Sequence, residues 1–225
     1  MEEILKQAEL TGALTDLAMG IIIIPMIILL SKKKTALKLQ KQWWLYFFAT
    51  LCVSCFLGFT VHYFCKSEIS KQIVWLPLFI LLYEVFNCFF LVALSIFSDD
   101  EKPQKKHIIT IHLISLTAYI ITQIFIRVYN FDSIRLLTVF NTVIALIGFA
   151  LILIKSFKKG HIGERVLFCA LLPMLPAGYF QIKRNTLVKM IWYFDHNGLT
   201  HLLIIASIII LFCAVNVCLD KKNSS

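Results

Sequence analysis

Charged side chains are scarce in this chain of 225 residues. They make up 16% of the sequence, whereas hydrophobic residues make up 59%, and the mean hydropathy is +0.82. One soluble core of this size cannot bury so much apolar surface, so an ordinary water-soluble fold is excluded. Nearly all of that surface must face lipid or other helices.

The chain also lacks polar linkers, low-complexity segments and obvious repeats. Its longest polar stretches are residues 31–42 and 98–106, so we expect a single domain over residues 1–225. The seven cysteines lie within or at the ends of apolar runs, where cysteine acts as a small apolar residue, and they imply no disulfide framework. No cleavable signal peptide is evident, because the first 12 residues are polar and no small-residue cleavage site follows the first apolar run.

Long apolar runs are what the chain has in abundance. Seven of them have a length suited to crossing a bilayer as a helix. We place these spans at residues 13–30, 43–65, 73–97, 107–127, 134–155, 164–181 and 199–219. The sixth holds Pro173 and Pro176, which should kink it or divide it into two short helices. The expected fold class is therefore all-α, a polytopic membrane protein built as a seven-transmembrane-helix bundle.

Basic residues are distributed unevenly between the two sides of this bundle. The loops after the first, third and fifth spans, together with the C-terminal tail, hold 14 of the 22 lysines and arginines, and the other side holds 8. The positive-inside rule then predicts an N-terminus outside and a C-terminus in the cytoplasm. The net charge of +9 favours anionic lipid headgroups as partners and is poor evidence for nucleic acid. The oligomeric state stays open.

Three of the six histidines should meet at the outer end of the bundle. His62 lies about one turn from the outer end of the second span, His201 about one turn into the last span, and His196 on its lip. Imidazole is the commonest side-chain ligand of zinc, and three protein ligands leave one position open for an activated water. We therefore expect these three histidines to hold a metal ion, Zn²⁺. Because a spacing of five residues separates His196 and His201 by about 140° on a regular helix, Gly198 would have to allow an irregular first turn.

Three acids could assist such a site as catalytic residues. Asp16 lies near the outer end of the first span, Asp195 precedes His196, and Glu84 lies near the middle of the third span. Hydrocarbon makes ionisable groups costly, so each is a candidate to orient a histidine or to act as general base. Each of these residues also has a simpler interpretation. Asp16 could be a first-turn acid that the helix macrodipole favours, and Glu84 could be a protonated acid with a structural role. His62 could be an interfacial histidine that is hydrogen-bonded to a backbone carbonyl.

Several motifs resemble those of the CREST superfamily, which contains the alkaline ceramidases and the progestin and adipoQ receptors. They are Trp43-Trp44 at the start of the second span, Gly58-Phe59-Thr60-Val61-His62 at its end, and Asp-His-Asn-Gly-Leu-Thr-His-Leu-Leu at residues 195–203. The chain is most similar to small bacterial members with Thr-Asp near the first helix. The resemblance implies seven spans, an outside N-terminus and a zinc held by one histidine of the second helix and two of the seventh. The matching residues are His62, His196 and His201, in a bacterial inner membrane with the site on the non-cytoplasmic side.

The chain departs from the ceramidase pattern at three places. Ceramidases space their last two histidines by four residues instead of five. They carry a serine where this chain has Gly58, and they place an acid one turn into the third span, whereas Glu84 lies deeper. These differences weaken the step from a zinc site to amide hydrolysis.

Two classes of function follow. The leading hypothesis is an integral membrane zinc-dependent hydrolase acting on a lipid-like amide or ester, similar to a ceramidase. The alternative is a non-enzymatic membrane receptor or small-solute carrier with a polar outer pocket. A carrier needs polar groups that continue toward the cytoplasm, and Glu84, Asn87, Gln123 and Asn141 provide little such path. A scaffold without any site would tolerate replacement of all three histidines.

Overall fold

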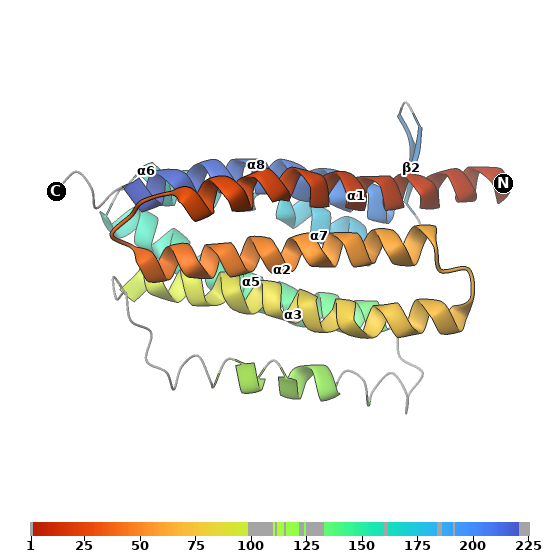
Figure 1. Cartoon of the computed structure of the whole chain (residues 1–225), viewed down its shortest axis with the longest axis horizontal. Helices are drawn as coiled ribbons and strands as arrows, with labels where there is room; N and C mark the ends of the chain where they lie inside the picture. The colour runs from red at the N-terminus through yellow and green to blue at the C-terminus, as the bar shows by residue number, and fades with distance from the viewer. Residues whose placement is uncertain are drawn as a thin grey trace.

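The chain folds into long helices and one short hairpin (Figure 1). The computed structural model describes residues 2–98, 133–159, 162–183, 186–190 and 192–220, together with 110, 112–114, 116–121 and 124. The elements are α1 (Glu2–Lys32), α2 (Lys38–Tyr63), α3 (Glu68–Ser98), α5 (Ser133–Lys159), α6 (Ile162–Leu171), α7 (Met174–Ile182), β1 (Leu187–Lys189), β2 (Tyr193–Asp195) and α8 (His196–Asp220).

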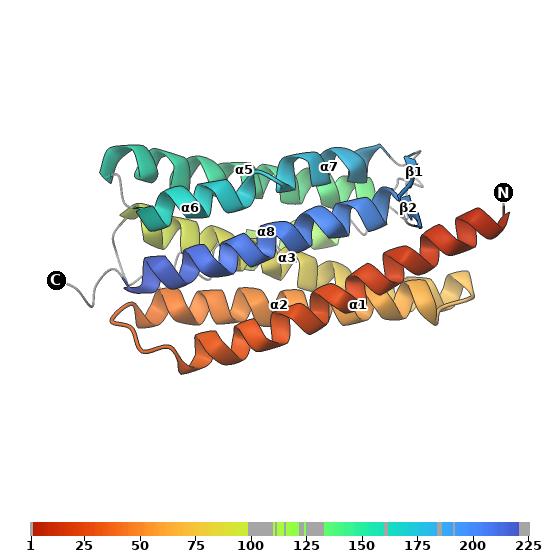
Figure 2. The same cartoon turned by 90° about the horizontal axis from the view of Figure 1, so that it is seen from above.

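The helices form a closed bundle. Helix α1 packs against α2 and α8, α2 packs against α3, and α3 packs against α5. Helix α8 in turn packs against α6 and α7, so the last helix closes the ring on the first (Figure 2). The helical residues 112–121 contact α3, where the rings of Tyr83 and Tyr119 meet edge to face at 6.1 Å between centroids.

Within the described residues, five helical segments are long and apolar enough to cross a membrane. They are Lys6–Lys32, Lys38–Tyr63, Ile69–Ser98, Asn141–Lys158 and His196–Asp220. These segments coincide with the first, second, third, fifth and seventh predicted spans, so the prediction of a mostly helical chain with membrane-length helices is confirmed. Of the 21 residues of the fourth predicted span, residues 107–127, ten lie outside the described residues.

The sixth predicted span is divided into two short helices, as its prolines predict. Helix α6 ends at Leu171 and α7 begins at Met174, with Pro173 at the N-cap of α7. Pro176 lies in the first turn of α7. The backbone N–H groups of a first turn have no partner within the helix, so a proline there removes no helical hydrogen bond. The backbone N–H of Ala177 donates to the carbonyl of Pro173, so the chain resumes a helix directly after the break. Both halves pack against α8 (Figure 2).

The apolar core fills one half of the bundle. Its fully buried side chains include Trp44 and Phe48 of α2, Leu91 of α3 and Leu211 of α8. All of them lie toward the end of the bundle at which the α1–α2 loop meets the last turn of α8, which we call the lysine end. The opposite end, where α8 starts beside the β1–β2 hairpin, is called the hairpin end. The cavity described below reaches from the hairpin end to this core, because Phe47, Leu51 and Leu211 line it.

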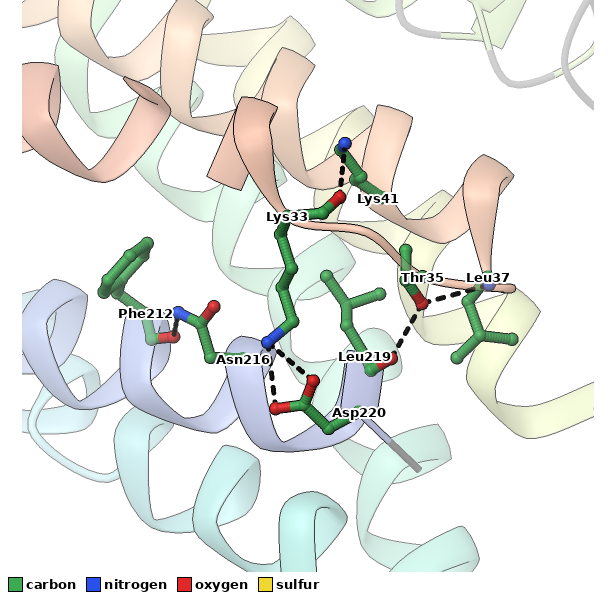
Figure 3. Close-up of polar contacts among 8 residues, drawn as sticks. All are labelled: Lys33, Thr35, Leu37, Lys41, Phe212, Asn216, Leu219 and Asp220. Atoms are coloured by element: carbon green, nitrogen blue, oxygen red, sulfur yellow. Dashed lines mark hydrogen bonds and ion pairs between the residues drawn. The ribbon is translucent and has the colours of Figure 1, made fainter. Parts of the chain in front are cut away.

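Polar contacts tie the lysine end together (Figure 3). The Lys33 ammonium lies 2.9 Å from the Asp220 carboxylate at the end of α8. The Thr35 hydroxyl donates to the Leu219 carbonyl at 2.7 Å and accepts a hydrogen bond from the backbone N–H of Leu37 at 3.1 Å. The five-residue loop is thus fixed to α8 at two neighbouring points.

The hairpin was not expected from the sequence. Strands β1 and β2 pair antiparallel, with Leu187 opposite Asp195, Val188 opposite Phe194 and Lys189 opposite Tyr193. The Asp195 carboxylate then accepts a hydrogen bond at 2.8 Å from the backbone N–H of Gly198, which caps the first turn of α8. The hairpin thereby fixes where α8 begins and how deep its next residues lie in the bundle.

Candidate functional site

An acid and a histidine from the two ends of the chain meet at the centre of the candidate site. The Oδ1 atom of Asp16 on α1 lies 3.4 Å from Nε2 of His201 on α8, and the exposed fractions of the two side chains are 8% and 16%. The pairing depends on a close approach of α1 to the first turn of α8. At Gly12 an added Cβ would lie 3.7 Å from Asp195 Oδ1 and 4.0 Å from the backbone nitrogen of Gly198, which is ordinary van der Waals contact, so α1 and the first turn of α8 lie close together there.

Thr15 orients the ring of His201. The Thr15 hydroxyl donates its hydrogen to the Gly12 carbonyl at 2.7 Å, and its oxygen lies 3.1 Å from His201 Nδ1. That oxygen therefore accepts from an Nδ1–H, which leaves Nε2 of a neutral ring without a hydrogen. A lone pair on Nε2 then faces a carboxylate oxygen 3.4 Å away. Two acceptors at this distance need either a bound cation or a proton between them, carried by the ring or by the carboxyl group.

Helix α2 makes room for the carboxylate at Gly58. A Cβ built on this residue would lie 2.6 Å from Oδ2 and 3.0 Å from Cγ of Asp16, much closer than ordinary van der Waals contact. Cys55, Gly58 and His62 lie three and four residues apart and share one face of α2. Cys55 and His62 line the same cavity as Asp16, and the His62 ring stands edge to face on Trp75 of α3 at 6.2 Å.

These groups lie on the wall of a cavity of about 460 Å³ inside the bundle. Its remaining wall is mostly apolar and comes from α2, α3, α5, α7 and α8. Three of the lining side chains, Leu146, Leu175 and Tyr179, are about half exposed, so the cavity opens sideways between α5 and α7. A volume of this size, apolar with a few convergent polar groups, is typical of a small-molecule pocket.

Two further polar atoms on the cavity wall have no hydrogen-bond partner in the described part of the chain. They are the carbonyl oxygens of Asn141 on α5 and Gln181 on α7, and both are buried. A buried acceptor without a partner is unfavourable by about 1–3 kcal/mol. A ligand that donates hydrogen bonds, such as an amide or a hydroxyl, would satisfy both.

The donor set has the chemistry of a metal site, but the residues are not yet arranged as one. In tetrahedral zinc sites with bond lengths near 2.0–2.2 Å, ligand atoms lie roughly 3.3–3.5 Å apart. The 3.4 Å between Asp16 Oδ1 and His201 Nε2 matches that separation. In the part of the chain that the structure describes, however, no group of three or more His, Cys, Asp or Glu side chains is close enough to hold an ion.

The structure separates Glu84 from the other candidates. Its carboxylate lies 3.2 Å from His112 Nδ1 and accepts a hydrogen bond at 3.3 Å from the Asn87 amide. Among the described residues that line the cavity, Glu84 does not occur. On this side of α3, Glu84 and His112 contact each other, and a polar partner lowers the free-energy cost of both groups in a membrane.

His196 and Asp195 lie at the start of α8 beside the cavity. His196 is the first residue of the helix, and its carbonyl accepts a hydrogen bond at 2.7 Å from the Thr200 hydroxyl. It is absent from the described cavity wall, whereas the next residue, Asn197, is part of it. Asp195 acts as the helix cap. The structure thus brings together Asp16, His62 and His201, with Asp195 and His196 at the edge.

Sequence reasoning assigned no site role to Thr15, Cys55 or Gln181. It counted Asn141 only among the few polar groups of a carrier path, and it noted Gly58 only in the motif before His62 and as a missing serine. The spacing of Cys55, Gly58 and His62 could have revealed that they share a helix face, and the position of Thr15 beside Asp16 was a further signal. Asn141 and Gln181 lie on helices whose rotation no pattern in the sequence indicates.

A family model matches residues 11–219 of the chain, and its description is a family of unknown function (DUF6962). The matched segment extends from α1 to the last turn of α8 and includes Asp16, His62 and His201. No curated protein and no solved structure matches the chain.

Proposed function

The chain belongs to this family of unknown function (DUF6962), and we propose that it is an integral membrane hydrolase that uses a zinc ion to cleave an amide or ester bond of a lipid-like substrate. One observation carries the proposal: a buried carboxylate and two imidazoles, from α1, α2 and α8, lie on the wall of an otherwise apolar cavity. Hydrolysis needs the polar groups, and an alkyl chain needs the apolar wall.

Zinc is supported by the donor chemistry. Asp16 and His201 present two acceptor atoms to each other at the separation of two zinc ligands, and His62 on the same cavity wall is the remaining donor. The Thr15 oxygen fixes the ring of His201 through Nδ1, as the hydrogen-bonding partners of metal-bound histidines commonly do. A proton shared by Asp16 and His201 would satisfy the same pair of atoms, so a metal analysis has to distinguish the two.

Each residue has a distinct role in the proposed reaction. A zinc ion bound here would supply an activated water and polarise the carbonyl group of the substrate. Asp16 Oδ1, His62 and His201 would hold the ion, and the second carboxylate oxygen of Asp16 would accept the proton of the attacking water. Asn141 and Gln181 accept hydrogen bonds from the substrate headgroup, and the apolar wall holds its chain and excludes bulk water. The sideways opening between α5 and α7 admits a substrate directly from the lipid.

We further propose that seven helical crossings span the membrane, with the N-terminus outside and the hairpin end on the non-cytoplasmic side. The five membrane-length helices, the α6–α7 pair as one divided crossing and the segment around residues 112–121 support this count. The concentration of basic residues at the lysine end supports the orientation. Reporter fusions at the α1–α2 loop and after Asp220 test it: alkaline phosphatase active at either fusion point would contradict the orientation.

Kinship with the CREST superfamily is part of the same proposal. The second-helix histidine and the last-helix histidine of the resemblance, His62 and His201, line one cavity. The Asp16 carboxylate occupies the space beside α2 that a serine side chain at residue 58 would need. In this chain the carboxylate from α1 takes the place of a group that ceramidases supply from α2.

The metal is tested first. The full chain, purified in a mild detergent without chelators, is analysed for zinc by elemental analysis, and about one ion per chain is expected. His201→Ala should lose it. His112→Ala, which removes an imidazole that is not part of the described cavity wall, is the matched control and should retain it. A wild type without stoichiometric zinc, or a His201→Ala variant that keeps its zinc, would exclude the metal site.

Activity is tested with fluorescent long-chain amides and esters in nanodiscs, with product release followed by chromatography. Asp16→Asn should abolish hydrolysis while the substrate still binds, because the amide keeps the shape of the carboxyl group but accepts no proton. The second candidate function is a receptor. The carbonyl oxygens of Asn141 and Gln181 also favour it, because they can bind a ligand without taking part in a reaction. Saturable binding of these lipids with no product from the zinc-loaded wild type would establish the receptor instead.

A further inference from the structure

A second concave site lies at the lysine end of the bundle, far from the histidines. It is a hollow of about 450 Å³ at the α1–α2 loop, which we call the lysine hollow. The residues that line it are Ser31, Lys32, Lys33, Lys34, Thr35, Lys38, Lys41, Gln42 and Leu45. Five of the nine carry an ammonium group.

Two of these lysines have structural partners. Lys33 is held by the Asp220 carboxylate, at 2.9 Å from both of its oxygens. The Lys41 ammonium donates to the carbonyl oxygens of Ser31 at 2.8 Å and Lys33 at 2.7 Å, so it caps the C-terminal end of α1. Figure 3 draws the contact with Lys33. A cation is favourable at a helix C-terminus because the unpaired carbonyls there carry partial negative charge. These contacts hold Lys33 and Lys41 in place at the hollow, and both ammonium groups already have partners.

The other three lysines have no such partner. Lys32, Lys34 and Lys38 are exposed, and in the described part of the chain no acidic side chain pairs with them. The sequence has no aspartate or glutamate anywhere between Asp16 and Glu68, so the loop supplies no negative charge of its own. Three unpaired positive charges at one hollow repel one another and create a strongly positive local potential. An anion placed among them would relieve that repulsion.

We propose that the lysine hollow binds the phosphate-bearing headgroup of an anionic membrane lipid. The hollow lies where two membrane-length helices end, which is the depth of lipid headgroups. The first turns of α2 carry Tyr46, which is about half exposed and is an aromatic residue of the kind that gathers at that depth. On α1, Ile28 and Leu29 are about half exposed and present an apolar surface along which an acyl chain can lie. A free phosphate ion would use the lysines but leave this surface uncovered.

The hollow is formed before any ligand arrives. Thr35 is bonded both to α8 and to the backbone of Leu37, and Lys41 joins the loop to the end of α1. Binding therefore orders only the three lysine side chains, which keeps its entropic cost low. The proposal for the lysine hollow does not depend on the histidine site or on the proposed hydrolase activity.

The test measures lipid binding to the full chain by native mass spectrometry in detergent. Phosphatidylglycerol is titrated against phosphatidylcholine with identical acyl chains, and the anionic lipid should bind at least about 10-fold more tightly. A triple variant, Lys32→Gln with Lys34→Gln and Lys38→Gln, should bind phosphatidylglycerol roughly 100-fold more weakly, because each lysine near an anionic headgroup contributes about five-fold. The single variants should each lose about five-fold, which keeps the test decisive if the triple variant does not fold.

The control removes the same charge at the other end of the bundle. Lys66, Lys183 and Lys189 are also exposed, and their combined replacement by glutamine should leave phosphatidylglycerol binding within about two-fold of wild type. Equal loss in both triple variants would mean that net charge alone attracts the lipid and would overturn the site. Full binding by the lysine-hollow variants would overturn it as well. Displacement of the lipid by millimolar inorganic phosphate would make free phosphate the ligand and overturn the lipid assignment.

Discussion

Replacing Gly58 by alanine should destabilise the protein, although alanine is the better helix former. In an unhindered helix this change contributes up to about 1 kcal/mol of stability. Here the new Cβ would lie 2.6 Å from Oδ2 of Asp16, so the carboxylate must retreat by roughly 0.8 Å to reach the ordinary contact distance of 3.4 Å. It would have to leave its position beside His201, and such overpacking typically costs about 1–3 kcal/mol. We expect a net loss of about 1 kcal/mol.

The sign should reverse when the carboxylate is removed. In an Asp16→Ala background the space beside α2 is free, and Gly58→Ala should then stabilise by up to about 1 kcal/mol. The coupling energy between the two substitutions is thus expected to be about 1–3 kcal/mol. Gly178 on α7 provides the control, because an added Cβ there meets no atom within 4 Å. Gly178→Ala should stabilise in both backgrounds.

Thermal unfolding in detergent can be followed with a thiol-reactive dye, since Cys52, Cys55, Cys65, Cys88 and Cys218 are buried in the native state. For a chain of this length, 1 kcal/mol corresponds to a shift in Tm of about 2–4 °C. Gly58→Ala should lower the Tm by this amount, and Gly178→Ala should raise it. A Gly58→Ala variant that gains stability in the wild-type background, or a sign that does not reverse with Asp16→Ala, would refute the contact between Asp16 and α2.

Three further substitutions test the site and the loop. Thr15→Val keeps the shape of the side chain but removes the oxygen that holds His201, so zinc affinity measured by calorimetry should fall about 10–100-fold, whereas Thr15→Ser should preserve it. Asn141→Leu removes a buried acceptor without a partner and should raise the Tm by about 2–4 °C while weakening lipid binding; an unchanged affinity would exclude Asn141 from the substrate site. Lys33→Gln should cost less than about 1 kcal/mol because the Asp220 carboxylate is 62% exposed, and a larger loss in Tm would show that the ion pair is stronger than its exposure implies.

The sequence was a good guide to the helices and their depth. Apolar runs predicted the positions of α2, α3, α5 and α8 to within a few residues, and Pro173 and Pro176 predicted the break between α6 and α7. The start of α1 was missed, because its first turns are polar and hydropathy gives no signal there. The hairpin was missed as well, since three-residue strands are too short for a reliable alternation pattern.

The candidate site was predictable only in part. Span counting places Asp16, His62 and His201 at a common depth, and the structure brings them to one cavity. Depth says nothing of rotation about the helix axis, however, and rotation is what separates Glu84 from the cavity and turns it toward His112. The roles of Thr15 and Gly58 arise from contacts of α1 with α8 and with α2. The packing of side chains sets these contacts. Such contacts leave no periodic pattern in a single sequence.

The uneven packing of the bundle has a mechanical consequence. At the lysine end, α1, α2 and α8 are joined by side chains that interlock and by a loop fixed to α8. Toward the hairpin end the same helices line the cavity, and α1 and α8 are joined there by the contacts of Thr15 and Asp16 with His201. Any widening of the cavity would have to separate these contacts first, while the packed core and the loop at the lysine end stay in place.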